Sequence, residues 1–283
     1  MTTLSAPQET AARPGPERAS RRRRGRLGDR ILFAYTWLII VWLAAPIGVM
    51  ILFGFNDTQS RFNQTFQGFT LKWYGRLFEI PALTEALVNS LIIAIASSLL
   101  SCVIGTLVGV ALGRYRFRGD GTTNFIMFAT ISSPELVTGA ALLSFFVSAG
   151  MGLGMVTILI SHVMFSISFV AVVVRARVLT LDPFIEEAAR DLGAGPWTAF
   201  WRVTFPVIFP AVLSGFMLAF ALSIDDFVIT NFTSGTTTTF PLWIWGSTRV
   251  GLPPQVNVMG TLIFAVGLLI VIGNAIAARR GPR

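Results

Sequence analysis

Long runs of apolar residues alternate with short polar segments over most of the chain. Each run is long enough to cross the ~30 Å hydrocarbon core of a bilayer as a helix that rises about 1.5 Å per residue. The pattern predicts six membrane spans, at residues 31–53, 86–112, 122–147, 155–174, 207–230 and 256–278. We therefore expect an all-α integral membrane protein in which residues 31–278 form a six-helix transmembrane domain.

The second run carries small residues at every fourth position, at Ser101, Gly105, Gly109 and Gly113. Such a row lets two helix backbones approach closely. We expect this face to pack against another helix. The alternative is that these glycines are tolerated without a packing role.

Both ends of the chain are polar and rich in arginine. Residues 1–30 combine proline, glutamate and the run Arg21–Arg24, and a segment of this composition cannot build an apolar core. We expect a disordered basic tail here and a second, short tail at residues 279–283. A tetra-arginine run beside a span is typical of an orientation signal or of contact with anionic lipid, and we favour this interpretation over nucleic-acid binding.

The basic residues are divided unequally between the two sides that six spans create. Eighteen of the 22 lie in the two tails and in the loops after the second and fourth spans. The opposite side holds Arg61, Lys72, Arg76 and Arg249. Because loops rich in arginine and lysine stay in the cytoplasm, we expect both termini and the 175–206 loop to be cytoplasmic.

The composition excludes several kinds of chemistry. The 283 residues are 53% hydrophobic and 13% charged, which is about half the charged share of a soluble domain. Cys102, His162 and Lys72 are each the only residue of their type, so a zinc site of histidines and cysteines and a Walker A loop are both excluded. We expect no cofactor and no catalytic residue, and any ATPase must be another chain. His162 is interpreted as a packed or hydrogen-bonded core residue, with a gate or pH sensor as the alternative.

A polar stretch at residues 182–206, interrupted by glycine and proline, separates the fourth and fifth runs. Asp182 and Pro183 suit the start of a helix, and Gly193 suits its end. Between them one helical face is apolar, at Ile185, Ala188, Ala189 and Leu192. A second short helix is expected from Gly195–Pro196 onwards. Because so short a helix is not stable alone in water, its apolar face must fold back on this chain or dock on another, and the pattern leaves both open.

The same stretch resembles the EAA loop of type I ABC importer permeases. Val203 and Phe205 stand where that family usually has isoleucine and leucine, and both keep an apolar side chain. Membership implies the MetI-like architecture, the cytoplasmic (inner) membrane of a bacterium, and a coupling helix that docks on a separate dimer of ABC ATPase subunits. The positions that match the loop, and to which the resemblance assigns this docking, are Glu187, Ala188, Ala189, Gly193 and Pro206.

Further segments within the last five runs are similar to the spermidine/putrescine permeases: Ser133–Val137, Ser161–His162, Glu187–Gly195, Leu222–Asp226 and Gly251–Asn257. This resemblance implies a polyamine permease that works with a second homologous permease chain, ATPase subunits and an extracytoplasmic substrate-binding protein. Related permeases carry ferric ion, thiamine or another organic cation, so the solute stays open. A stand-alone channel or carrier and a membrane-embedded enzyme are the remaining alternatives.

Acidic residues interrupt the predicted spans at Glu135, Asp225 and Asp226. An acid at the bilayer centre costs on the order of 3 kcal/mol, so it usually faces a cavity or a partner. We expect these acids to line the path of a cationic solute, with Glu135 near the middle of the third span beside a kink at Pro134. Only one of the adjacent pair should face the path, because neighbouring helical residues point about 100° apart. The alternative is that the acids are interfacial, or that they pair with Arg249 or a neighbouring subunit.

Overall fold

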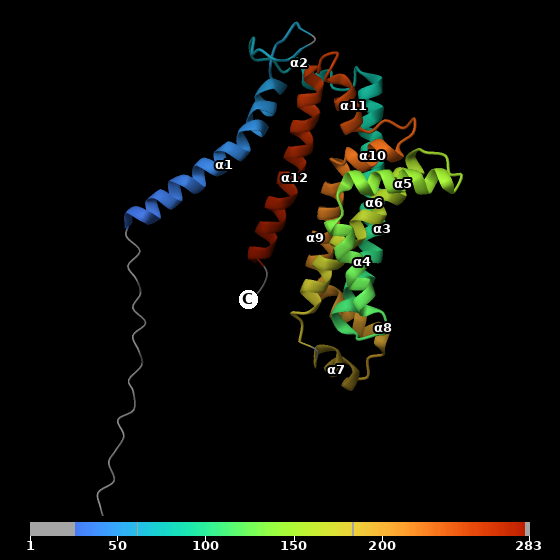
Figure 1. The fold of residues 1–283 in the computed structure, drawn as a ribbon. Coiled ribbons are helices and arrows are strands. Elements are labelled where there is room, and N and C mark those ends of the chain that lie inside the picture. Colours follow the sequence, from blue (N-terminus) through green and yellow to red (C-terminus); the bar gives the residue numbers. More distant parts are fainter. Residues whose placement is uncertain (1–25, 61, 183, 281–283) are drawn as a thin grey trace, which may run out of the picture. The chain divides into compact units, whose positions relative to one another are not determined.

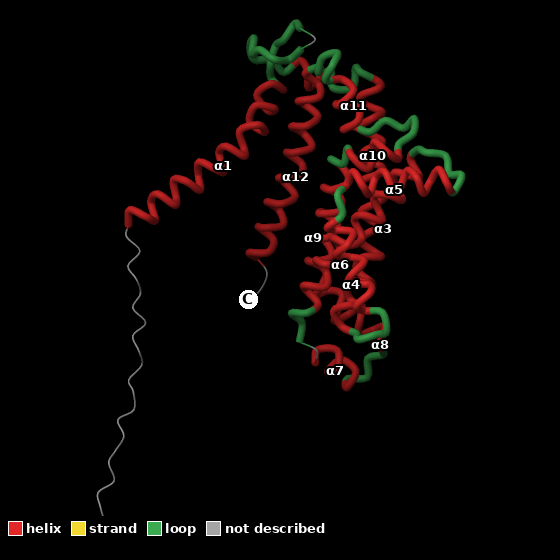
Figure 2. The backbone as a smooth tube through the Cα atoms, viewed as in Figure 1, coloured by secondary structure: helices red, strands yellow, loops and turns green. Residues whose placement is uncertain are grey.

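The computed structural model describes residues 26–60, 62–182 and 184–280, so the predicted tail at residues 1–25 and residues 281–283 lie outside the described part. Every element in this part is a helix (Figures 1 and 2). The bounds are α1 (Arg26–Gly54), α2 (Lys72–Gly75), α3 (Pro81–Arg114), α4 (Asp120–Ser132), α5 (Glu135–Ser148), α6 (Met155–Val178), α7 (Phe184–Asp191), α8 (Pro196–Ala199), the π-helical turn η1 (Phe200–Thr204), α9 (Phe205–Ile224), α10 (Val228–Thr233), α11 (Phe240–Ser247) and α12 (Pro254–Arg280).

Four helical segments are long and apolar enough to cross a membrane: Gly28–Gly54, Pro81–Arg114, Met155–Val178 and Pro196–Ile224. The pair α4 and α5 makes a fifth candidate if the two helices count as one broken span. In α12 the apolar stretch assessed runs from Pro254 to Ile270 and is shorter. The protein is therefore an all-helical membrane protein with four to five candidate spans.

The chain divides into two units, residues 1–50 and 51–283, and each is described by itself. The first unit contains most of α1, an apolar helix whose described side chains are largely exposed. This helix already begins at Arg26, so the last five residues of the predicted 1–30 tail are helical. In the second unit, the loop before α3 contains the four-residue helix α2.

The core of the second unit is the helix trio α3, α6 and α9. Val170 and Val174 of α6 and Ile208 and Ala219 of α9 are fully buried. The apolar pattern of these runs therefore reflects packing between helices as well as contact with lipid. In Figure 2 these helices form the centre of the second unit.

The row of small residues on α3 is where α6 approaches most closely. A Cβ atom built on Gly105 would lie 2.7 Å from Cβ of Val170, and one on Gly113 would lie 2.7 Å from Cγ1 of Val178. At Gly109 the nearest atom would be a backbone oxygen, at 2.7 Å. A real side chain does not fit at these distances, so the predicted close packing of this face is confirmed.

The third predicted span differs from expectation. Residues 122–147 form two helices, α4 and α5, which meet at an angle of 110°. Ser133 and Pro134 are both extended, as expected where proline removes a backbone donor and disfavours helix in the residue before it. Figure 1 shows α4 running along the bundle and α5 turning across it. Glu135 is consequently the first residue of α5, where its negative charge is favourable, and not a mid-helix residue.

The fifth predicted span, 207–230, also breaks. Helix α9 ends at Ile224, and α10 starts at Val228. The carboxylate of Asp226 accepts hydrogen bonds from the backbone N–H groups of Ile229 (3.4 Å) and Thr230 (2.7 Å) in the first turn of α10. An aspartate that satisfies the free donors of a helix start favours such a break, because it offers the backbone an alternative to a continuous helix.

Candidate functional site

The stretch at residues 182–206 folds as a short helix with well-defined ends. Oδ1 of Asp182 accepts a hydrogen bond from the backbone N–H of Phe184 at 3.0 Å, which confirms the predicted cap. Gly193 has φ +86°, a conformation that favours glycine. The N–H of Gly193 donates to the carbonyl of Arg190 at 2.8 Å, and that of Ala194 to the carbonyl of Ala189 at 3.0 Å. These two bonds form a Schellman motif, so Gly193 ends α7 as predicted.

Most of the apolar face of α7 is not covered by the described part of the chain, although Ala189 is half-buried. Leu192 is 90% exposed, Phe184 67% and Ile185 38%. Ala188 and Glu187 are exposed as well. Of the two possibilities that the pattern left open, folding back on the described part of this chain is therefore contradicted. A helix of eight residues with an uncovered apolar face is suited to a surface on another protein.

The opposite side of α7 is tied to the transmembrane helices through Glu186. Its Oε1 atom lies 3.0 Å from Nη2 of Arg114, the last residue of α3, and accepts a hydrogen bond from the hydroxyl of Thr204 in η1. Burial opposes ionisation of Glu186. The hydrogen bonds from Thr204 and Arg114 and the charges of Arg114 and Arg190 outweigh it, so the pKa of the carboxyl lies below its usual value.

Sequence reasoning missed Glu186, because its partner lies 72 positions earlier in the chain. The available signals were an arginine at the end of the second run and an acid on the helix face opposite Ala188. Glu187, Ala188 and Ala189 share α7, and Gly193 ends it, whereas Pro206 lies in the first turn of α9. The helical segment Pro196–Ile224 joins α8, η1 and α9 without interruption, so the α7 loop leads directly into a span.

A second group of polar residues surrounds Asp226. Nε2 of His162 lies 3.3 Å from Oδ2 of Asp226 and 2.9 Å from Oγ1 of Thr230, whose hydroxyl donates to Asp226 at 2.7 Å. Nδ1 of His162 lies 2.6 Å from Oγ of Ser223, and Ser97 donates to Ser223 at 3.0 Å. Both ring nitrogens of His162 and the hydroxyls of Ser97, Ser223 and Thr230 therefore have hydrogen-bond partners within this group. The expectation that His162 is a hydrogen-bonded core residue is confirmed.

Asp225 has different surroundings from its neighbour. It is exposed and lines a cavity of about 540 Å³ between the end of α9, α11 and α12. The cavity wall is mainly apolar and aromatic, and it includes Phe227 and Trp245, whose ring centroids are 5.1 Å apart. A single carboxylate beside aromatic rings is an arrangement that suits an ammonium ion. None of the ion pairs in the described part of the chain joins Arg249 to Asp225 or Asp226.

The three acids expected in one path are not gathered in this chain. Asp226 bonds to α6 and α10, Asp225 lines the cavity beside α11, and Glu135 is exposed at the start of α5. A fourth acid, Glu85 on α3, was not singled out because it falls at the edge of a predicted loop. It lines a second cavity, of about 500 Å³, with Asn89, Trp243 and the threonines at 236–238.

Comparison with known proteins gives both a family and close relatives. Residues 105–283 match the family described as "Binding-protein-dependent transport system inner membrane component". The chain is 38% identical over 254 residues to the spermidine/putrescine transport system permease protein PotC of Escherichia coli K12, covering 89% of this chain and 96% of that protein. It is also 38% identical over 258 residues to the putrescine transport system permease protein PotI of the same organism, covering 86% and 91%.

Solved structures agree on the fold. One is a bacterial ABC transporter involved in the import of the acidic polysaccharide alginate, with a TM-score of 0.65 at 16% identity, covering 92% of this chain and 98% of that one. Another is a methionine ABC transporter in an inward-facing conformation, with a TM-score of 0.59 at 18% identity, covering 71% and 96%. At such identities the likeness shows the importer permease fold and nothing about the solute.

Proposed function

The chain belongs to the family of binding-protein-dependent transport system inner membrane components, and on that premise we propose that it carries polyamines such as putrescine and spermidine. Membership makes it the permease component of an ABC importer, a transport subunit of the inner membrane and not an enzyme. The family also implies an ATPase and a substrate-binding protein as partners. The observation that carries the proposed solute is the 38% identity over nearly the whole of two permeases named for polyamines.

The cavity beside Asp225 supports a cationic solute. A polyamine is a flexible chain of ammonium groups joined by methylenes, and it loses water when it enters the membrane. A carboxylate and aromatic faces replace that water, and they bind the cation weakly enough for it to be released. We place Asp225 in contact with the solute, Asp226 behind it as the residue that fixes the start of α10, and Glu135 as a second acidic contact at the start of α5.

We propose the six-span topology for the assembled protein, with the bent pair α4–α5 as the third span and α12 as the sixth. Both termini then lie in the cytoplasm with the α7 loop. A second, homologous permease chain would complete the pathway beside the cavity at Asp225. The two permeases would sit on a dimer of ATPase subunits.

The coupling contact is proposed to be the exposed face of α7. Glu187, Ala188 and Ala189 would touch the ATPase subunit, Gly193 would fix the end of the helix, and Pro206 would start the span that follows. The support is geometric, since the apolar side chains of α7 are open and its other side is tied to α3 by Glu186.

The experiment is uptake of radiolabelled putrescine and spermidine by proteoliposomes that contain the whole complex and its binding protein. Asp225→Asn should lower uptake about tenfold, the equivalent of one charge-assisted hydrogen bond. Glu79→Gln, an exposed acid in the loop before α3, is the matched control and should transport normally. A complex that moves ferric ion or thiamine but neither polyamine would show that the proposed solute is wrong.

A further inference from the structure

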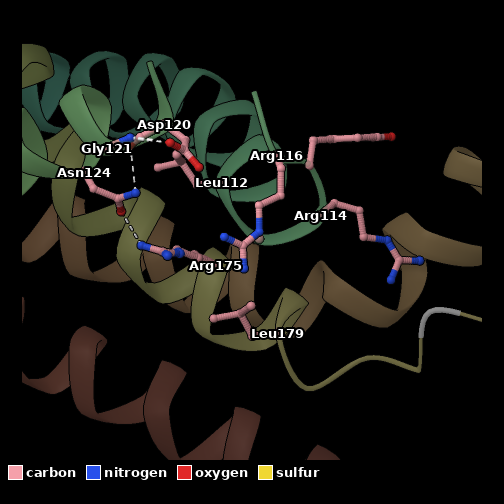
Figure 3. A pocket seen from close by; sticks show the side chains of 10 residues that line it. Leu112, Arg114, Arg116, Asp120, Gly121, Asn124, Arg175 and Leu179 are labelled. Atoms are coloured by element: carbon pink, nitrogen blue, oxygen red, sulfur yellow. Dashed lines mark hydrogen bonds between the residues drawn. The ribbon is translucent and has the colours of Figure 1, made fainter. Parts of the chain in front are cut away.

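A cavity of about 330 Å³ lies where α3 ends, α4 begins and α6 ends (Figure 3). It is separate from the cavities that contain Asp225 and Glu85, and the coupling loop does not line it. Three arginines and one aspartate give it its charge. The lining residues are Leu112, Gly113, Arg114, Tyr115, Arg116, Asp120, Gly121, Asn124, Arg175 and Leu179.

The charged groups of this cavity are not balanced. Arg114 is paired with Glu186, and Figure 3 shows its side chain pointing away from the other two arginines. Arg116 is directed towards Arg175, and neither has an ion-pair partner among the described residues. Two guanidinium groups that share a cavity repel each other unless an anion lies between them.

Arg175 lines this cavity and has a buried donor without a partner among the described residues. Its Nη1 atom donates to Oδ1 of Asn124, while its Nε atom is buried and has no hydrogen-bond partner among the described residues. A buried charged donor without an acceptor is costly, so an acceptor is expected there. The carboxylate of Asp120 already accepts from the backbone N–H of Gly121 at 2.6 Å.

Exposed apolar side chains lie beside the charged groups of the cavity. Leu179 is 62% exposed and Tyr115 is 58% exposed, and both line it. Phe117, in the same loop as Arg116, is 41% exposed. Guanidinium groups beside exposed apolar side chains at the ends of apolar helices match the level of lipid headgroups, with the chains of the lipid below them.

We propose that this cavity binds the phosphate group of an anionic phospholipid, with Arg116 and Arg175 as its donors and Leu179 and Tyr115 against its acyl chains. Guanidinium groups suit this ligand because their paired N–H groups match two phosphate oxygens. A free phosphate ion would use the same arginines but would leave the apolar rim uncovered. The site is independent of which solute the permease carries.

The test is native mass spectrometry of the detergent-purified complex with added phosphatidylglycerol or phosphatidylcholine. The wild-type complex should bind phosphatidylglycerol in preference. Arg116→Gln should weaken that binding about fivefold, as expected for one arginine near an anionic lipid. Arg118→Gln changes an exposed arginine two positions away that does not line the cavity, and it should bind like wild type.

A second variant tests the buried donor. Arg175→Lys keeps the charge but removes the Nε–H and the planar fork, so phosphatidylglycerol binding should fall while the complex remains assembled. Equal binding of the two lipids, or wild-type binding by Arg116→Gln, would overturn the proposal. Millimolar inorganic phosphate should not displace the lipid. Complete displacement would also overturn it, because the cavity would then be a site for soluble phosphate.

Discussion

The chain carries two pairs of adjacent acids, Glu186–Glu187 on α7 and Asp225–Asp226 after α9, and in each pair one member bonds inside the protein while the other is exposed. Glu186 meets Arg114 at 3.0 Å, and Asp226 meets His162 at 3.3 Å. Glu187 and Asp225 are exposed. The inner acid of each pair fixes a helix, which leaves the outer acid free for contact with another molecule.

The two inner acids differ in how they are held. Glu186 is balanced by the permanent charge of Arg114, and the two side chains are 16% and 13% exposed. Asp226 is 9% exposed and is held by neutral donors, the N–H and hydroxyl of Thr230, together with the 4% exposed His162. The comparison teaches that near water an ion pair is sufficient, whereas deeper in the bundle the protein surrounds the acid with hydrogen bonds.

The largest expected effect comes from breaking the deeper site. Asp226→Ala would leave the N–H and the hydroxyl of Thr230 without their acceptor, which should destabilise the protein by about 3 kcal/mol. Asp225→Ala removes an exposed carboxylate and should change stability by less than about 0.5 kcal/mol. Thermal unfolding of the purified complex, monitored by size-exclusion chromatography, gives the melting temperatures of the two variants for comparison. Equal melting temperatures for both variants would contradict the division of this pair into an acid that stabilises the fold and an acid that does not.

The next effect concerns the end of α7. Gly193→Val places a β-branched residue at φ +86°, which should cost about 1–2 kcal/mol and distort the Schellman motif. Ala188→Trp should block close approach to a partner without straining the helix. Both variants should lose solute-stimulated ATP hydrolysis and transport while inserting normally into the membrane. Wild-type coupling in both would show that α7 is not the contact with the ATPase.

A smaller effect is expected at Glu186. Because the pKa of this carboxyl is lowered in the folded protein, its stabilising contribution is present at neutral pH and is lost as the pH falls through that lowered pKa, below the usual value of about 4.3. Protease protection of the α7 loop should therefore decrease on acidification. Glu186→Gln should reduce protection by about 1 kcal/mol at neutral pH and remove the pH dependence. If Glu186→Gln loses protease protection at low pH as the wild type does, another group causes the pH dependence.

The smallest effect on stability should come from Glu187→Gln, within about 0.5 kcal/mol, because this side chain is exposed. Retention of the ATPase subunit by the immobilised permease should nevertheless weaken. Glu187 would then act through contact with another molecule, as proposed for Asp225, whereas Glu186 and Asp226 stabilise the fold. Undiminished retention together with wild-type transport would leave Glu187 without a role in docking.

Where the sequence predicted structure well, the signals were local. The cap at Asp182 and the stop at Gly193 each depend on residues within one or two turns, and the glycine row on α3 is a repeat within one helix. The 110° turn at Pro134 was expected only as a kink. Its size depends on the docking of α5 against α10, where a Cβ on Gly139 would lie 2.6 Å from the ring of Phe232.

The candidate site depends on contacts between residues far apart in the sequence, and one sequence did not predict these contacts. His162 and Asp226 are 64 positions apart, and Arg114 and Glu186 are 72 apart. Periodicity shows that each of these polar residues lies within or beside an apolar run, but it does not show which residues are in contact. The roles proposed for Glu135 and Asp225 involve contacts with a solute, which the pattern of one sequence does not describe.

We expect the glycine row to make α3 and α6 move together as one stiff rod. With backbone and valine atoms in direct contact along three successive turns, the two helices have no side-chain layer that could slide or compress. This rod carries Arg114 at one end and Ser97, which bonds to Ser223 beside His162, about 25 Å further along. We therefore expect a movement of α7 to pass through the Glu186–Arg114 pair to this rod, and along it to the hydrogen-bonded group around Asp226.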